Sequence, residues 1–286
     1  MSSVKQALAD ARLRLAGLAD ADPDLDARVL LCHVLGKPPT WLYAWPDAEL
    51  DAEQRTAFDE LLSRRAAGTP VAHLTGRREF WGLSLQVSPA TLIPRPDTEL
   101  LVEVALALGG DRPALKALDL GTGSGAIALA IASERPGWQI TASDASAAAL
   151  AVAAANAAAL NLQRLRLLPG HWFDALPAGE SFDLIVSNPP YVDAEDMTEL
   201  PVEYQHEPAL GLAAGDDDPA VIVGAGDKRC TLTEPSFVAR TEQVGALDRH
   251  LADALSGQHS LGLLEAESGG GKTRLLWGRA GRAAHA

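Results

Sequence analysis

The sequence is poor in cysteine and in positive charge. Its 286 residues include only two cysteines, Cys32 and Cys230, which lie far apart and show no metal-binding spacing. We therefore expect neither a disulfide framework nor a metal site, and a reducing cytoplasm is the expected compartment. Lysine and arginine total 24 against 38 aspartate and glutamate residues, which gives a formal net charge of -14. That balance argues against a surface built to hold nucleic-acid phosphates.

Long apolar runs are also missing. No stretch of about 18 apolar residues occurs, so we expect no membrane span. The first twenty residues carry charges throughout and lack the apolar core of a signal peptide. Hydrophobic residues nevertheless make up 47% of the chain, so it can bury a sizeable core and global disorder is not expected.

The first part of the chain has helical periodicity. Apolar residues recur at helical spacing in "VKQALADARLRLAGL", "LDARVLLCHVLG" and "DAEQRTAFDELLSRRAAG". This pattern predicts a small helical domain over residues 1–75. Extended runs around Gly76 then predict a β-hairpin linker over residues 76–94.

Strands and helices alternate over residues 95–216. The strand-like segments are "ALKALDLG", "QITASD", "LRLLPG" and "FDLIVSNPP", and the helix-like segments between them are "AIALAIASER" and "ASAAALAVAAANAAAL". This order predicts an α/β fold with a doubly wound, parallel sheet and right-handed crossovers. In such sheets ligands bind beyond the carboxyl ends of the strands.

A glycine-rich turn follows the first of these strands. In "LDLGTGSGAIALA" the strand ends at Asp119, and Gly121, Gly123 and Gly125 alternate with Thr122 and Ser124. Glycines permit positive φ and let a ligand approach the backbone closely. The spacing differs from the G-x-G-x-x-G of dinucleotide-binding loops, and a plain tight turn between strand and helix would also explain it.

The ends of the next two strands add to that signal. Asp144 ends "QITASD" about twenty residues after the glycines, where an acid can accept hydrogen bonds from ribose hydroxyls. Alone, Asp144 would be read as a helix cap, but together with the glycine turn it favours a ribose-containing ligand. Trp172 is the candidate to lie against an adenine ring, with Phe173 second. Both rings could instead pack in the core, which we expect for Phe173.

The last strand ends in "SNPPY". Neither proline has an N–H for the sheet, so the strand must stop there and a stiff turn follows. Asn188 and Tyr191 are presented beside that turn. The plain alternative is a strand-terminating turn with Asn188 as a local cap.

With these motifs placed, the chain resembles the peptide chain release factor N5-glutamine methyltransferases. The resemblance runs to about Gly215 and includes "EFWGLSLQVSPATLIPRPDTELLVE", "LDLGTGSGAIALA" and "IVSNPPYV". It implies a helical domain, a hairpin and a Rossmann-like methyltransferase sheet. It also implies a cofactor, S-adenosylmethionine, and a substrate, the glutamine of the Gly-Gly-Gln loop in class I release factors. The cofactor-binding residues that it implies are Gly121, Thr122, Gly123, Ser124, Gly125, Asp144, Trp172 and Asn188.

The resemblance also implies roles at the catalytic turn. Asn188 would accept one substrate N–H through its side-chain oxygen, and the backbone carbonyl of Pro189 would accept the other. Pro190 would stiffen the turn, and Tyr191 would pack on the flat amide group. Such contacts act through positioning and electrostatics, so no general base is needed before attack. One local departure is His171, where members of the family often have aspartate.

Partner recognition is expected from the helical domain. Arg77, Arg78 and Arg95 are candidate contacts to the release factor or internal ion-pair partners, and solvated surface positions are at least as plausible for each. We expect no membrane association, no nucleic-acid partner and a monomer.

Residues 217–286 form an atypical tail. "FVARTEQVGALDRHLADAL" and "LGLLEAESGGGKTRLL" resemble the start of a P-loop signal-transduction ATPase, with Gly271, Lys272 and Thr273 at the end of a phosphate loop. Ala266 stands in place of the first glycine of that loop, and too few residues follow for a magnesium-binding strand, so we expect no nucleotide hydrolysis. The tail is a fusion or assembly artefact, a divergent remnant, or a substitute by pattern for the missing helix and strand. Because a bare sheet edge invites aggregation, we predict that "SLGLLEAE" pairs beside "FDLIVSN".

Two other functions share part of this pattern. An adenine N6-methyltransferase acting on nucleic acid would also use "NPPY", although the acidic charge and "LIPRPDTE" weigh against it. A truncated, non-catalytic fusion protein that only binds the cofactor or a partner would keep the motifs and lack a complete sheet.

Overall fold

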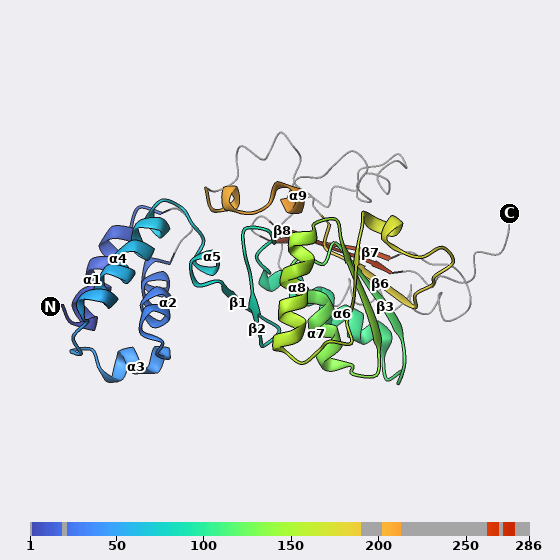
Figure 1. Ribbon diagram of the computed structural model, residues 1–286, viewed down its shortest axis with the longest axis horizontal. Coiled ribbons are helices and arrows are strands. Elements are labelled where there is room, and N and C mark those ends of the chain that lie inside the picture. The colour runs from blue at the N-terminus through green and yellow to red at the C-terminus, as the bar shows by residue number, and fades with distance from the viewer. Residues whose placement is uncertain (1, 19–21, 190–201, 213–261, 269–270, 278–286) are drawn as a thin grey trace. The chain divides into compact units, whose positions relative to one another are not determined.

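The computed structural model describes residues 2–18, 22–189, 202–212, 262–268 and 271–277 (Figure 1). Its contacts group the chain into two compact units, which are Met1–Arg77 with Thr198–Glu207, and Arg78–Met197 with Pro208–Ala286. The four-part division made from the sequence stays a prediction. Within the described residues, none of the helices is both long enough and apolar enough to cross a membrane.

The described part of residues 1–77 contains five α-helices. They are α1 (Val4–Leu15), α2 (Pro23–Leu35), α3 (Pro39–Ala44), α4 (Ala52–Ala66) and α5 (Val71–Thr75). Ser3 and Asp51 start α1 and α4 with capping boxes, in which the cap side chain and a glutamine three residues later satisfy each other's backbone N–H groups. The apolar faces of these helices bury one core, which includes Leu15, Leu30, Leu31, Phe58 and Leu62.

A buried arginine joins the 3-10 helix η4 (Val202–His206) to this helical core. Arg65 of α4 is only 3% exposed, and its guanidinium contacts Asp26 at 2.7 Å and Glu203 at 2.5 Å. Burial raises the pKa of Asp26 although Arg65 pairs with it, and the nearby charge of Glu203 adds to the increase. The helix η4 is therefore held to α4 by a buried guanidinium that pairs with two partly exposed carboxylates.

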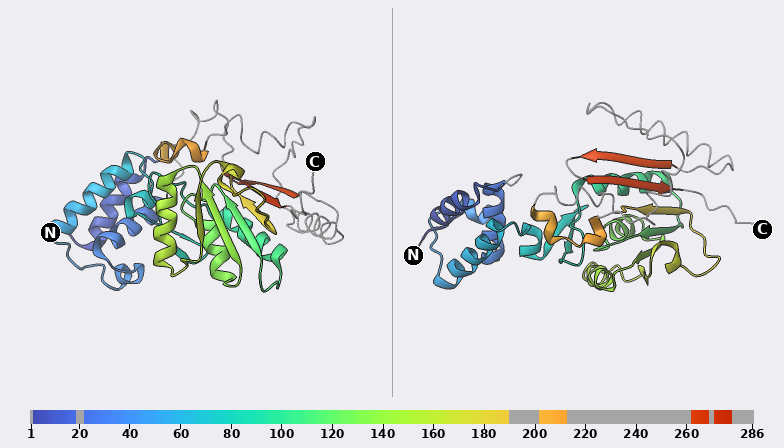
Figure 2. Two further views of the ribbon diagram at one scale, coloured as in Figure 1. Left: turned by 45° about the vertical axis from the view of Figure 1, so that its right-hand side comes forward. Right: turned by 90° about the horizontal axis from the view of Figure 1, so that it is seen from above.

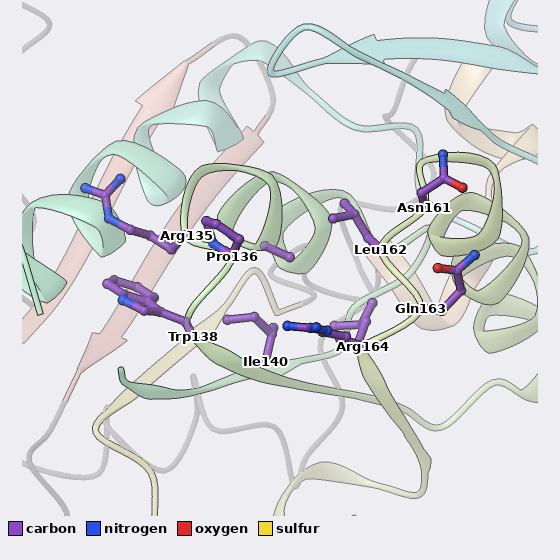
Figure 3. Close-up of a pocket in the computed structure, with 10 residues that line it drawn as sticks. Arg135, Pro136, Trp138, Ile140, Asn161, Leu162, Gln163 and Arg164 are labelled. Atoms are coloured by element: carbon purple, nitrogen blue, oxygen red, sulfur yellow. The ribbon is translucent and has the colours of Figure 1, made fainter. Parts of the chain in front are cut away.

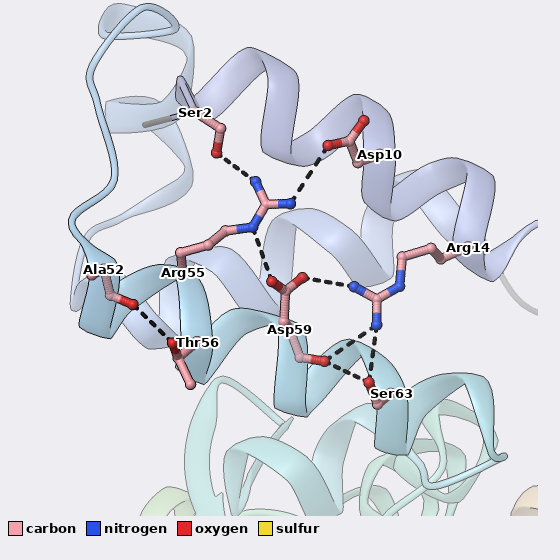
Figure 4. Close-up of polar contacts among 8 residues, drawn as sticks. All are labelled: Ser2, Asp10, Arg14, Ala52, Arg55, Thr56, Asp59 and Ser63. Atoms are coloured by element: carbon pink, nitrogen blue, oxygen red, sulfur yellow. Dashed lines mark hydrogen bonds and ion pairs between the residues drawn. The ribbon is translucent and has the colours of Figure 1, made fainter.

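A second charge network lies on the surface of the same unit (Figure 4). Asp59 of α4 accepts hydrogen bonds from Arg14 at 2.7 Å and from Arg55 at 3.0 Å. These side chains are substantially exposed, so the network contributes little to stability.

The chain enters the second unit through a two-stranded sheet of β1 (Arg77–Phe80) and β2 (Leu83–Gln86). The two residues between the strands, Trp81 and Gly82, have φ of 53° and 69°, as a tight type I′ hairpin turn requires. The backbone N–H of Trp81 donates to Glu99 at 2.8 Å, and its indole N–H donates to Glu134 at 3.0 Å. The hairpin turn is thereby fixed to the helices of the second unit.

The second unit contains a four-stranded sheet with the order β5-β4-β3-β6, and every neighbouring pair is parallel. The strands are β3 (Lys116–Leu120), β4 (Gln139–Asp144), β5 (Arg166–Pro169) and β6 (Leu184–Ser187), and the helices are α6 (Glu99–Gly109), α7 (Ala126–Glu134) and α8 (Ala147–Ala159). This arrangement confirms the predicted α/β fold. Side chains of β3 alternate between two cores: Ala117 packs with the cluster that includes α6 and α7, whereas Leu118 and Leu120 pack with Phe182.

The tail differs from its prediction. The short helix α9 (Ala209–Leu212) is followed among the described residues by β7 (Gly262–Ser268) and β8 (Gly271–Trp277), which pair with each other in antiparallel fashion. The predicted pairing of "SLGLLEAE" beside "FDLIVSN" is wrong, because among the described strands β7 pairs with β8 alone and β6 is an edge strand of the main sheet. It is β8 that contacts β6 (Figure 2). A partner close in sequence costs less loop-closure entropy than a distant one, which favours the local pair.

The phosphate-loop resemblance has no support in the fold. Gly271, Lys272 and Thr273 form the start of β8 rather than a loop that leads into a helix. The other segment of that resemblance, residues 237–255, lies outside the described residues.

Candidate active site

Three neighbouring strands end together at one edge of the sheet. Leu120 of β3 lies in register with Ser143 of β4 and with Ser187 of β6. The hydroxyl of Ser187 also donates to the carbonyl of Leu120 at 2.9 Å. The next residues along the chain, Gly121, Asp144 and Asn188, therefore emerge at the same edge, as the sequence predicted for a ligand site of a parallel sheet.

The glycine loop has the backbone that its sequence requires. Gly121, Gly123 and Gly125 have φ of 70°, 57° and 83°, which side-chain-bearing residues rarely adopt. A Cβ at Gly121 or Gly123 would meet nothing within 4 Å, whereas one at Gly125 would lie 3.0 Å from Leu129 and 3.2 Å from Ala153. The first two glycines thus leave room beside the loop for a ligand, and the third allows close packing.

Hydrogen bonds from β4 hold the first half of the loop. The backbone N–H groups of Gly121 and Thr122 both donate to the carbonyl of Ser143 at 2.9 Å. One carboxylate oxygen of Asp144 accepts from the N–H of Gly123 at 2.8 Å, and the other accepts from the N–H of Ser146 at 2.8 Å. Asp144 therefore orients the loop, and its remaining lone pairs are available for ribose hydroxyls.

A buried acid lies beneath the loop. Asp119 is 1% exposed, and burial raises its pKa to about 7. The hydroxyl of Thr122, which donates to Oδ2 at 2.6 Å, opposes this shift, and so does the backbone at Ala128. Within the described part of the chain, no hydrogen bond of normal geometry reaches Oδ1. From the sequence, Asp119 was expected only to end a strand. An acid inside an apolar strand was the signal that could have indicated this titratable group.

The catalytic turn presents an acceptor. Asn188 follows β6 directly, and its Oδ1 is buried without a hydrogen-bond partner among the described residues. A buried acceptor of this kind costs free energy unless a ligand N–H donates a hydrogen bond to it. Pro189 is buried beside it. Pro190 and Tyr191 lie outside the described residues, so their roles stay predictions.

Trp172 and Phe173 are placed differently from each other. Trp172 begins the 3-10 helix η2 (Trp172–Ala175) with a φ of 42°, which is unusual for a bulky residue. Its half-buried ring packs against the cluster of Leu118, Leu120 and Phe182. Phe173 is 54% exposed, so the expectation that it packs in the core is wrong. In a single tight turn, successive side chains point in different directions, and only Trp172 reaches the sheet.

Arg78 is less exposed than a solvated surface residue. It lies half-buried in β1, and its Nε is one of the buried atoms that lack a hydrogen-bond partner in the described structure. Burial lowers the pKa of Arg78, and the charge of Arg95 lowers it further. The carboxylates of Glu99 and Glu79 oppose this shift. The contact of Arg78 and Arg95 with a release factor remains a prediction.

A cavity of about 460 Å³ lies at the opposite edge of the sheet (Figure 3). Its lining includes Arg135, Trp138, Ile140 and Arg164, close to where β4 and β5 begin. None of the site residues predicted from the sequence lines it. This cavity is therefore separate from the cluster of Gly121–Gly125, Asp144 and Asn188.

Comparison with known proteins identifies the family. Residues 6–76 match the family model of the PrmC N-terminal domain, and residues 96–203 match that of the methyltransferase small domain. The release factor glutamine methyltransferase of Shewanella oneidensis is 48% identical over 216 residues, which cover 76% of this chain and 74% of that relative. The chain belongs to the release factor glutamine methyltransferase family. The resemblance read from the sequence motifs is thereby confirmed, and the chain is a methyltransferase.

Other similarities agree with this membership. The release factor glutamine methyltransferase of Escherichia coli strain K12 is 50% identical over 205 residues, covering 72% of this chain and 73% of that relative. Among solved structures, a human methyltransferase 10 domain containing protein covers 79% of this chain and 99% of its own at 18% identity, with a TM-score of 0.42. A likeness of that degree carries no argument about function.

Proposed function

We propose that the chain transfers a methyl group from S-adenosylmethionine to the side-chain amide nitrogen, N5, of the glutamine in the Gly-Gly-Gln motif of class I release factors. The observation that carries the proposal is the buried Oδ1 of Asn188, which has no hydrogen-bond partner among the described residues and follows β6 at the sheet edge where the glycine loop follows β3. Family membership supports the same reaction, because the relatives are named for glutamine methylation of release factors.

The residues at the sheet edge fit the cofactor. The open space beside Gly121 and Gly123 suits the close approach of its methionine part. The fixed carboxylate of Asp144 suits its ribose hydroxyls. We assign the adenine ring to the side of Trp172, and the remaining contacts of the loop to Thr122, Ser124 and Gly125. When bound, S-adenosylmethionine supplies an electrophilic methyl on a sulfonium, and it leaves as neutral S-adenosylhomocysteine.

The task of the protein is to present a poor nucleophile. An amide nitrogen has its lone pair delocalised into the carbonyl, so it must be held in line with the methyl group. Oδ1 of Asn188 would accept one N–H of the substrate amide, and the carbonyl of Pro189 would accept the other. As the N–C bond forms, the nitrogen becomes cationic, and these two acceptors stabilise the developing positive charge. The nitrogen then releases one proton to solvent, which restores a neutral amide.

The partner and setting follow from the same assignment. We assign recognition of the release factor to the helical unit, with Arg77, Arg78 and Arg95 as contact candidates. We place the enzyme in the cytoplasm as a monomer without a nucleic-acid partner. The net charge of -14 and the scarcity of cysteine support that setting.

The test is methyl transfer from labelled S-adenosylmethionine to a purified class I release factor. The release factor with Gln→Ala in its Gly-Gly-Gln motif and a DNA duplex serve as alternative substrates. We expect label on the wild-type release factor alone. Label on DNA would replace the proposal with adenine methylation, and no label despite cofactor binding would favour a non-catalytic protein.

Asn188→Ala tests the residue that carries the proposal. Loss of one positioned hydrogen-bonding group typically lowers kcat by about 10²–10³-fold, and we expect that loss to exceed any weakening of S-adenosylhomocysteine binding. Asn161→Gly is the matched control, because Asn161 is an exposed asparagine with a φ of 58° that lines the cavity at the opposite edge. A loss of equal size in both variants would contradict the role of Asn188.

A further inference from the structure

Helix α8 contains one polar side chain in an apolar sequence. Its residues read "AAALAVAAANAAA", and Asn156 is the polar one. Asn156 is 1% exposed. A buried amide in such a helix must find partners for its oxygen and its two N–H groups, because leaving them unpaired is costly.

All of these groups are paired. Oδ1 of Asn156 accepts from the backbone N–H of Gln86 at 2.7 Å. Its Nδ2 donates to the carbonyl of Gln86 at 3.0 Å and to the carbonyl of Ser124 at 2.9 Å. Only the oxygen can accept the N–H of Gln86, so the orientation of the amide is fixed by the network.

The two partners belong to different functional parts. Gln86 is the last residue of β2, in the hairpin whose turn is fixed by Trp81 to Glu99 and Glu134. Ser124 belongs to the glycine loop. Asn156 therefore connects an anchored hairpin to the loop through one rigid side chain.

This connection complements the hydrogen bonds from β4. Those bonds hold Gly121, Thr122 and Gly123, whereas the carbonyl of Ser124 is held by Asn156. We propose that Asn156 is a positioning residue for cofactor binding, which fixes the second half of the glycine loop against the hairpin. The identity of the cofactor rests on the function proposed above.

A purely structural role makes a different prediction. If Asn156 only helped α8 to pack, its loss would loosen the whole unit evenly. If it positions the loop, its loss would free the loop far more than the sheet, and would weaken cofactor binding more than an equally destabilising change elsewhere in α8.

Asn156→Asp is the variant that separates these cases. The size is kept, and one oxygen can still accept the N–H of Gln86. The other would face the carbonyl oxygens of Gln86 and Ser124 with one proton at most, so at least one of the two hydrogen bonds that Nδ2 donates is lost. Ala157→Gly is the matched control, because Ala157 is the next residue and is also buried. The substitution lowers the helix propensity of α8 and leaves the hydrogen bonds of Asn156 in place.

The first measurement is amide hydrogen exchange in the cofactor-free proteins. For Asn156→Asp we expect the amide of Gly125, which donates to the carbonyl of Thr122 in the second half of the loop, to exchange about 10-fold faster relative to those of Leu118 and Ala142 in the sheet. For Ala157→Gly we expect no such local difference. An even change across loop and sheet in Asn156→Asp would overturn the proposal.

The second measurement is calorimetric binding of S-adenosylhomocysteine. We expect Kd to rise about 10-fold in Asn156→Asp and less than about 2-fold in Ala157→Gly. Equal Kd in wild type and Asn156→Asp would overturn the proposal. If Asn156→Asp does not fold, Asn156→Ser replaces it in both measurements, with the same expected results. This substitution leaves the carbonyl of Ser124 unpaired without adding charge.

The two proposals fail separately. A wild-type chain that binds S-adenosylhomocysteine but does not methylate release factors would overturn the proposed function and leave the role of Asn156 intact. Methylation by the wild type with an unaltered loop in Asn156→Asp would do the reverse.

Discussion

Asp119 makes stability of the sheet unit depend on pH in a direction opposite to that of an ordinary salt-bridged carboxylate. Burial raises its pKa from 3.8 to about 7, so the folded state binds the proton more tightly than the unfolded chain does. The stabilisation is complete below about pH 4 and is lost as pH rises to about 7. At 1.36 kcal/mol per pKa unit, the full effect is about 4 kcal/mol, and about 2 kcal/mol of it falls between about pH 5.5 and 7.

Asp119→Asn removes this titration while keeping a group that can accept from the hydroxyl of Thr122. The assay is urea unfolding of the cofactor-free proteins, followed by circular dichroism at several pH values from about 5.5 to 8. Because all other titrating groups are shared, the free energy of unfolding of the variant minus that of the wild type isolates Asp119. We expect this difference to rise by about 2 kcal/mol across the range and to level off above about pH 7.

A difference that stays constant with pH would show that Asp119 is ionised throughout the range. Burial would then be compensated by the N–H groups at the start of α7 and by Thr122 more fully than its missing partner at Oδ1 indicates.

Four further substitutions test the packing, the two charge networks and the glycine loop. Gly109→Ala would place a Cβ 1.8 Å from the ring of Trp138, and we expect unfolding to become easier by about 3 kcal/mol in urea titrations. Arg65→Met leaves Asp26 and Glu203 without their buried cation and should cost about 3 kcal/mol, whereas Asp59→Asn in the exposed network should cost less than about 1 kcal/mol. Gly123→Ala, at a φ of 57°, should cost about 1–2 kcal/mol and weaken S-adenosylhomocysteine binding measured by calorimetry.

Each of these expectations has a clear counter-result. A neutral Gly109→Ala would mean that the ring of Trp138 has room to move. Equal costs for Arg65→Met and Asp59→Asn would mean that burial does not separate the two charge networks. Unchanged cofactor binding in Gly123→Ala would place the ligand away from the glycine loop.

Local pattern was enough for the fold class and for much of the candidate site. Alternation of strand and helix segments predicts a parallel sheet because short crossovers permit little else. The glycines, Asp144 and Asn188 were found because each directly follows or ends a strand, and parallel strands bring their carboxyl ends to one edge. The motif resemblance then gave the family, which the relatives confirm.

Local sequence patterns could not predict contacts between segments that lie far apart in the chain. The partner of Gln86 lies 70 residues away in Asn156, and the pKa of Asp119 depends on how completely helices cover a strand. The pairing of β7 with β8 rather than with β6 was also missed. The pattern of an exposed sheet edge does not indicate which segment can pair with it at the lowest cost in loop-closure entropy.

The sequence by itself therefore determined the order of elements, the sheet edge that binds ligands and the residues that end its strands. These depend on backbone geometry and on neighbours in the chain. Only the tertiary structure decided that Asn156 joins the hairpin to the glycine loop, that Asp119 holds its proton near neutral pH, and that Arg65 joins η4 to the helices. Those properties arise from burial and from partners brought together by folding, and no local pattern encodes them.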